Sequence, residues 1–148
     1  MMLDRAEFPG AEVRPSPNFG DRRSSLPDML LLHYTGMDSA EEALSWLCSE
    51  NSEVSAHYFV FEDGRIIQMG AEDRRAWHAG ASFWQGETDN NSRSIGIEIA
   101  NPGHQGDYRD FPADQIESVI RLCRHCVDRW AILPQRVLAH SDLSLIHI

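Results

Sequence analysis

Glu98 is the residue of this sequence whose setting most needs a chemical explanation. It lies in the segment 94–99, Ser-Ile-Gly-Ile-Glu-Ile, whose β-branched residues predict a short buried strand. An ionised glutamate among apolar neighbours is costly unless it is paired or titrates. Two other apolar runs each end in a histidine, His33 after residues 29–32 and His140 after residues 137–139. If these strands lie side by side, two imidazoles and a carboxylate meet at one sheet end, the makings of a hydrolytic zinc site.

The spacing of these residues in the sequence does not decide which role each would have in such a site. Neutral imidazole suits Zn²⁺, and a catalytic zinc ion keeps three protein ligands and an open position for water. Glu98 could be the third ligand, or it could be the base that takes a proton from the water. A single histidine at a strand end is more commonly a solvated polar residue, but two of them flanking a buried glutamate favour the metal site.

Length and charge exclude several classes of protein. A chain of 148 residues has the length of one domain. A net charge of −10 argues against a nucleic-acid partner. No apolar run approaches the roughly 20 residues that span a bilayer, and the first residues lack the apolar core of a signal peptide, so the expected location is the cytoplasm. Three cysteines, Cys48, Cys123 and Cys126, suit reduced thiols, with Cys123 and Cys126 packed in the core.

The pattern of elements predicts an α/β domain with a mixed central sheet flanked by helices. The apolar run 29–34 predicts a central strand, followed by a helix that Asp38 caps and that ends near Glu50. Asp63-Gly64 predicts a tight hairpin between strands over residues 54–62 and 65–69. The last strand is expected over residues 137–140.

A second helix is expected after Pro112, and its apolar stripe would face the sheet. The stripe comprises Ile116, Val119, Ile120, Cys123, Val127 and Trp130. Residues 1–28 are predicted to form an extended arm that runs over the surface. Residues 70–93 have no regular period but contain aromatic residues and glycines, and a long loop of this kind is more often functional than idle.

Five segments, taken in order, carry a resemblance to a known family. They are Ser55-Ala56-His57-Tyr58-Phe59, Asp63-Gly64-Arg65-Ile66-Ile67-Gln68, Arg75-Ala76-Trp77-His78-Ala79-Gly80, Ser94-Ile95-Gly96-Ile97-Glu98 and Ala139-His140-Ser141-Asp142. Together they resemble the zinc-dependent N-acetylmuramoyl-L-alanine amidases of the type-2, AmpD-like group, whose fold the peptidoglycan-recognition proteins share. The resemblance runs from about residue 29 to residue 142, which is taken as the amidase domain.

The resemblance implies a reaction and assigns residues to it. The reaction is hydrolysis of the amide between the lactyl group of N-acetylmuramic acid and L-alanine, in peptidoglycan fragments or muropeptides. His33 and His140 match the two zinc-binding histidines, and Glu98 matches the catalytic glutamate. Trp77 and His78 match a loop that borders the substrate cleft.

The chain departs from the family pattern after Asp142. The family continues with a lysine that stabilises the oxyanion and an aspartate that is the third zinc ligand, and this sequence has neither. Residues 143–148 are expected to be a non-native tail on a truncated gene product. The chain is therefore expected to bind zinc weakly and to be nearly inactive, unless Asp142 or His147 replaces the missing ligand.

Two rival functions remain. One is a peptidoglycan-recognition module that keeps the groove without catalysis. The other is a zinc hydrolase of a different amide. The sequence favours muropeptides released in wall recycling over intact wall, because no signal peptide is recognised.

Overall fold

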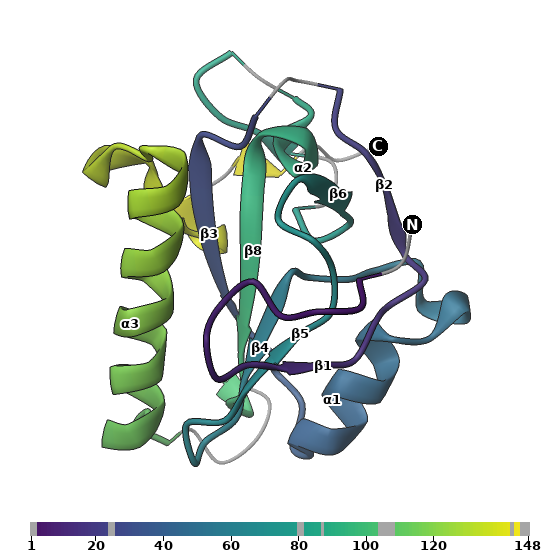
Figure 1. Cartoon of the computed structure of the whole chain (residues 1–148), viewed down its shortest axis with the longest axis vertical. Coiled ribbons are helices and arrows are strands. Elements are labelled where there is room, and N and C mark those ends of the chain that lie inside the picture. Colours follow the sequence, from purple (N-terminus) through teal and green to yellow (C-terminus); the bar gives the residue numbers. More distant parts are fainter. Residues whose placement is uncertain are drawn as a thin grey trace.

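The central feature of the fold is a mixed β-sheet with one helix packed on each face (Figure 1). The computed structural model describes residues 3–23, 26–79, 82–86, 88–103, 109–142 and 144–145. Within these residues the sheet has six strands in the order β1-β5-β4-β8-β3-β9. Their bounds are Glu12–Val13 (β1), Met29–Tyr34 (β3), Tyr58–Val60 (β4), Ile66–Gln68 (β5), Ser94–Ile99 (β8) and Val137–Ala139 (β9). The predicted α/β class is confirmed.

The four strands β4, β8, β3 and β9 are parallel to one another. Parallel strands bring their carboxyl ends to the same edge, and ligand sites of open α/β sheets lie at that edge. The β3–β8 register pairs His33 with Glu98. The predicted hairpin joins β4 and β5 as an antiparallel pair, and Gly64 in its turn has a φ of 94°. The hairpin's strands are shorter than expected, and β9 ends one residue before the predicted end at His140.

The helices α1 (Ala40–Leu47) and α3 (Ala113–Trp130) cover opposite faces of the sheet (Figure 1). Strand alternation separates the two cores, because successive side chains point to opposite faces. Phe59 packs with Leu44 and Leu47 of α1, whereas Tyr58 and its neighbour on β8 pack with α3. The face that carries Phe59 is also the face of its register partner Glu98.

The cap of α1 differs from the prediction. Ser39, not Asp38, is the N-cap, because its side-chain oxygen accepts a hydrogen bond from the backbone N–H of Glu42. The helix ends at Leu47, and the predicted end near Glu50 instead belongs to a short 3₁₀ turn over Glu50–Ser52.

The buried face of α3 is rotated from the predicted apolar stripe. Ile116 and Ile120 are 46% and 47% exposed, whereas Gln115 and Ser118 are buried. These polar side chains tolerate burial because they satisfy backbone carbonyls. Gln115 donates to the carbonyls of Val60 and Ala100, and Ser118 donates to that of Gly64. The rest of the stripe does pack against the core, together with Leu122 and Cys126.

The N-terminal arm and the long loop both contain strands that the sequence pattern does not reveal. The arm contributes β1 to the main sheet, and its β2 (Phe19–Asp21) pairs with β6 (Arg74–Ala76) of the loop. The loop also contains the short helix α2 (Asn90–Arg93) and β7 (Ser82–Phe83), which pairs with β10 (Ser144–Leu145).

Two further 3₁₀ turns flank β9, over Pro134–Arg136 and His140–Asp142. Among the described helices, none is both long and apolar enough to cross a membrane.

Candidate active site

Three predicted site residues lie at the carboxyl-end edge of the parallel strands. His33 is on β3, Glu98 is its register partner on β8, and His140 directly follows β9. The rings of His33 and His140 are 4.5 Å apart between centroids. The convergence that the apolar runs suggested is therefore present, because His33 lies on β3 and His140 directly follows β9, the strand that pairs with β3.

His78 is the third imidazole at this edge. Its Nδ1 atom lies 3.1 Å from Nε2 of His33, and its Nε2 atom lies 3.0 Å from the hydroxyl of Ser94. A Cβ atom on Gly96 would come within 2.6 Å of the His78 ring, so only glycine at this point of β8 leaves room for the imidazole. This contact gives the glycine of the Ser-Ile-Gly-Ile-Glu segment a structural reason.

Burial shifts the pKa values of His33, His78 and Glu98 in the direction that favours their neutral forms. Desolvation lowers the pKa of His33 to about 3, and the neighbouring His140 adds to the effect. Desolvation also holds the pKa of His78 well below its usual range. Burial raises the pKa of Glu98 to about 8. These pKa shifts favour neutral imidazoles on His33 and His78 and a carboxyl on Glu98 that exchanges its proton near neutral pH.

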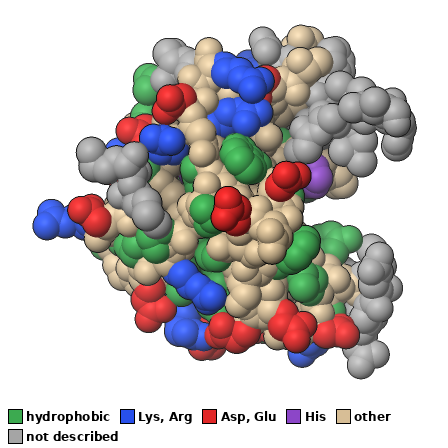
Figure 2. Space-filling view, turned by 90° about the vertical axis from the view of Figure 1, so that its right-hand side faces the viewer, with side chains coloured by type: hydrophobic (Ala, Val, Ile, Leu, Met, Phe, Trp, Pro, Cys, Tyr) green, Lys and Arg blue, Asp and Glu red, His purple; other side chains and the backbone are tan. Residues whose placement is uncertain are grey.

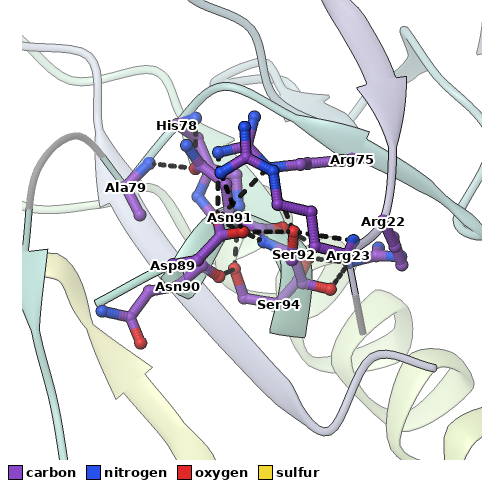
Figure 3. Close-up of polar contacts among 10 residues, drawn as sticks. All are labelled: Arg22, Arg23, Arg75, His78, Ala79, Asp89, Asn90, Asn91, Ser92 and Ser94. Atoms are coloured by element: carbon purple, nitrogen blue, oxygen red, sulfur yellow. Dashed lines mark hydrogen bonds and ion pairs between the residues drawn. The ribbon is translucent and has the colours of Figure 1, made fainter. Parts of the chain in front are cut away.

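The segment 77–79 touches both candidate ligands, and one side chain holds it in place (Figure 3). Asn91 of α2 accepts hydrogen bonds at Oδ1 from the backbone N–H of His78 at 2.9 Å and of Ala79 at 2.7 Å. The carbonyl of Ala79 in turn lies 3.2 Å from Nε2 of His140. Asn91 thereby reaches His33 through His78 and His140 through Ala79.

Helix α2 is itself fixed by partly buried charged side chains. Asp89 caps it, with Oδ2 accepting from the Ser92 hydroxyl at 2.7 Å, and Arg75 donates two hydrogen bonds to Oδ1 of Asp89 (Figure 3). Arg22 donates to the carbonyls of Ser92 and Ser94 at 2.7 and 3.0 Å. Sequence reasoning missed this support, because a four-residue helix inside an aperiodic loop gives no periodic signal.

Two clefts meet at His33. One, of about 190 Å³, lies toward α1, and the other, of about 480 Å³, lies toward β9. The first is lined by His33, Thr35, Met37, Ala43, Trp46, Leu47, Val54, Ser55, Trp77, His78 and Glu98. The second is lined by residues 32–36 and 139–141. Figure 2 shows an indentation of the surface with a histidine at its inner wall and hydrophobic side chains along one edge.

The predicted cleft residues Trp77 and His78 both line the first cleft. Ser55 holds Trp77, since the Trp77 N–H donates to its hydroxyl at 2.9 Å. His78 instead uses both ring nitrogens within the protein, on His33 and Ser94. Trp46, which is 51% exposed, lines the same cleft and was not singled out from the sequence.

The remaining candidates lie away from the histidine pair or are otherwise engaged. Oδ2 of Asp142 accepts the backbone N–H of Ala139 at 2.9 Å, and His147 lies outside the described residues. Cys126 is fully buried in the core, as predicted, and all three cysteines are free.

The two histidines each leave one nitrogen for a metal ion, but they do not make a complete set of ligands. His33 and His140 each use Nε2 in a contact within the protein, so Nδ1 of each ring is the nitrogen left for a metal. In the part of the chain that the structure describes, no three His, Cys, Asp or Glu side chains form a group able to hold a metal ion.

Fold and site together define an α/β domain whose polar groups gather at the carboxyl ends of parallel strands, beneath a loop that shapes a cleft. Residues 22–146 match the N-acetylmuramoyl-L-alanine amidase family, and the chain belongs to that family. The family that the five segments resemble is confirmed.

Two curated relatives and a solved structure give the scale of the similarity. The chain is 36% identical to N-acetylmuramoyl-L-alanine amidase AmiD of Escherichia coli, over 78% of this chain and 45% of AmiD. It is 28% identical to 1,6-anhydro-N-acetylmuramyl-L-alanine amidase AmpD of the same organism, over 97% of this chain and 86% of AmpD. The E. coli AmiD complex with anhydro-N-acetylmuramic acid-L-Ala-D-γ-Glu-L-Lys superposes with a TM-score of 0.72 at 34% identity, covering 82% of this chain and 51% of AmiD. The chain thus spans about half of AmiD and most of AmpD.

Proposed function

We propose that this chain is a zinc-dependent amidase that cleaves the bond between the lactyl group of N-acetylmuramic acid and L-alanine in peptidoglycan fragments or muropeptides. The observation that carries the proposal is the convergence of His33, His140 and Glu98 at one sheet edge beside a cleft. Family membership and the substrates named for AmiD and AmpD support the same reaction.

His33 and His140 would hold the zinc ion through Nδ1, because their Nε2 atoms contact His78 and Ala79. A bound zinc ion would supply Lewis-acid chemistry, lowering the pKa of water towards about 7 and polarising the substrate carbonyl. The third ligand stays unassigned among the described residues. Weak zinc binding remains a prediction, so assays of the chain need saturating zinc.

Glu98 would move the proton during hydrolysis. Its carboxylate takes a proton from the attacking water as the water oxygen bonds to the amide carbon. The same carboxyl then gives that proton to the alanine nitrogen as the carbon–nitrogen bond breaks. The products are a lactyl carboxylate and a peptide with a free amino group. A carboxyl whose pKa burial raises to about 8 is suited to both transfers near neutral pH.

The two clefts suit a substrate that extends on both sides of the scissile amide. Because they meet at His33, the sugar would occupy one and the stem peptide the other. Trp77 and Trp46 supply aromatic surface to the cleft beside Glu98. The choice between recycled anhydro-muropeptides and intact wall, and the cytoplasmic location, stay predictions.

Incubation of the zinc-saturated chain with an anhydromuramoyl tripeptide, followed by mass spectrometry, tests the proposal. We expect slow release of the tripeptide with a free alanine amine, and no release after chelation. Release of internal peptide fragments instead would indicate a hydrolase of a different amide.

A non-catalytic recognition module is the second candidate. The observation that favours it is that His78, the third imidazole at this edge, already uses both ring nitrogens within the protein, on His33 and Ser94. Such a module would bind the muropeptide in calorimetry, with or without zinc, and would leave it intact at saturating zinc.

A further inference from the structure

The hydrogen bond of His140 fixes which of its ring nitrogens carries the proton. Nε2 of His140 lies 3.2 Å from the carbonyl oxygen of Ala79. A carbonyl oxygen only accepts hydrogen bonds, so Nε2 of His140 must be the donor. In the neutral ring, Nδ1 is then the nitrogen with the free lone pair.

A longer chain of hydrogen bonds fixes the proton of His33 in the same way. Figure 3 shows the part of this chain that runs from Asn90 through Ser94 to His78. The hydroxyl of Ser94 has one proton, and it donates this proton to the Asn90 carbonyl at 2.5 Å. Towards Nε2 of His78, at 3.0 Å, the Ser94 oxygen can therefore only accept. His78 is thus protonated at Nε2, which leaves Nδ1 as an acceptor.

His33 completes this chain. Its Nε2 atom lies 3.1 Å from Nδ1 of His78 and must donate to it. The lone pair of neutral His33 is then on Nδ1, as it is in His140. One serine hydroxyl, at the first residue of β8, orders the protons of two imidazoles.

Asn91 holds the segment that contains His78 and Ala79, and the hydrogen bonds of His33 and His140 both depend on the position of this segment. Its Oδ1 atom accepts two consecutive backbone N–H groups, those of His78 and Ala79. The side chain is largely buried, with the residue 9% exposed. Loss of this acceptor would release the His78 ring from His33 and the Ala79 carbonyl from His140 together.

We propose that Ser94 and Asn91 are positioning residues that set the tautomers of the two candidate metal ligands, Ser94 for His33 alone and Asn91 for both His33 and His140. The significance for zinc rests on the proposed function, but the tautomers do not. Residues outside a metal's ligand set that orient ligating histidines commonly change metal affinity by about 10- to 100-fold.

The tautomers can be read in the chelator-treated, ¹⁵N-labelled protein by long-range ¹H–¹⁵N correlation at pH 8. We expect His33, His78 and His140 to carry the proton on Nε2. In Ser94→Ala, His33 and His78 should change to mixed tautomers while His140 stays unchanged. Ser118→Ala is the matched control, because Ser118 is also a buried serine whose hydroxyl donates to a backbone carbonyl. It should alter none of the three rings.

Asn91 is tested by a pair of variants. Asn91→Leu removes the acceptor and should disturb both His33 and His140, whereas Asn91→Asp keeps an oxygen acceptor and should retain the parental tautomers. Far-ultraviolet circular dichroism checks that each variant is folded. A proton on Nδ1 of His33 in the parent, or a Ser94→Ala spectrum identical to that of Ser118→Ala, would overturn the proposal.

Zinc affinity, measured by competition with a chromogenic chelator, supplies the second readout. Ser94→Ala should bind zinc about 10-fold more weakly than Ser118→Ala. Equal affinities would refute the positioning role of Ser94. Failure of the parent itself to bind zinc would contradict the proposed function and leave the tautomer result to decide this inference.

Discussion

His33 and Glu98 are register partners across the parallel strands β3 and β8. Side chains at paired positions of neighbouring strands share a face of the sheet, so this pairing places a candidate metal ligand beside the candidate base. A slip of one residue would turn Glu98 into the core under α3. The register is held by the apolar runs on both strands, which are buried.

Glu98 is predicted to act in proton transfer and not in metal binding. Glu98→Gln keeps the shape of the side chain but cannot take a proton. Turnover of muropeptide should fall by about 10²- to 10⁴-fold, the usual contribution of general acid–base catalysis, while zinc affinity stays within twofold. Mass spectrometry and a chelator competition measure the two quantities. Loss of zinc in Glu98→Gln would show that Glu98 is a ligand.

His33 and His140 are predicted to be required for zinc binding. His33→Ala and His140→Ala should each abolish measurable zinc binding, because either change removes one of two imidazole ligands. His125→Gln is the control, since His125 lies on α3 and contacts buried Glu72 at 3.0 Å. Unchanged zinc affinity in His33→Ala, measured by titration calorimetry, would contradict the assignment.

The stability of the metal-free protein should depend on pH through Glu98. Burial raises the pKa of Glu98 from 4.5 to about 8 in the folded protein, so the folded state binds this proton more tightly than the unfolded chain does. The contribution of Glu98 is therefore most favourable below pH 4.5 and is lost as pH rises to about 8.

Glu98→Gln removes this dependence, because glutamine stays neutral. Above pH 8 the metal-free variant should be more stable than the parent by roughly 1–3 kcal/mol, less than the full pKa difference because the carboxyl is partly solvated in the cleft. The two proteins should converge near pH 5. Urea unfolding in the presence of chelator measures the stability of the two proteins. A difference in stability that grows towards acid pH would contradict the predicted direction of the effect.

Gly96→Ala should destabilise the fold because the new Cβ atom would come within 2.6 Å of the His78 ring. The cost should be about 1–3 kcal/mol, typical of overpacking a buried site. Gly20→Ala is the matched control in a strand, since its nearest neighbour would be Nε1 of Trp77 at 4.0 Å. Thermal unfolding of the two variants compares them, and equal melting temperatures would contradict the close packing of His78 on β8.

The parts of the fold that the sequence predicted are those with continuous apolar runs. β3 and β8 have the bounds expected from residues 29–34 and 94–99, and the Asp63-Gly64 turn joins the expected hairpin. The buried face of α3 was predicted only in part, because Ile116 and Ile120 are exposed whereas the rest of the predicted stripe packs against the core. Apolar periodicity cannot anticipate that Gln115 and Ser118 satisfy backbone carbonyls at strand ends.

The candidate site also contains residues that the sequence predicted and residues that it did not. The histidines and Glu98 were identifiable because each ends or interrupts an apolar run. Asn91 gave no such signal, since its role depends on the fold of a loop that brings residues 77–79 back over β8. Hydrogen bonds to backbone groups leave no periodic trace in the sequence.

The proposed amidase activity, with Glu98 as the residue that transfers the proton, is tested most directly by muropeptide hydrolysis at saturating zinc. Mass spectrometry compares the parent chain with Glu98→Gln. We predict that the parent releases the alanine-terminated peptide slowly and only with zinc. Glu98→Gln should bind zinc equally but release at least 100-fold less peptide, the lower range for loss of a general base. An intact muropeptide after prolonged incubation with the zinc-bound parent, or equal release by both proteins, would contradict this prediction.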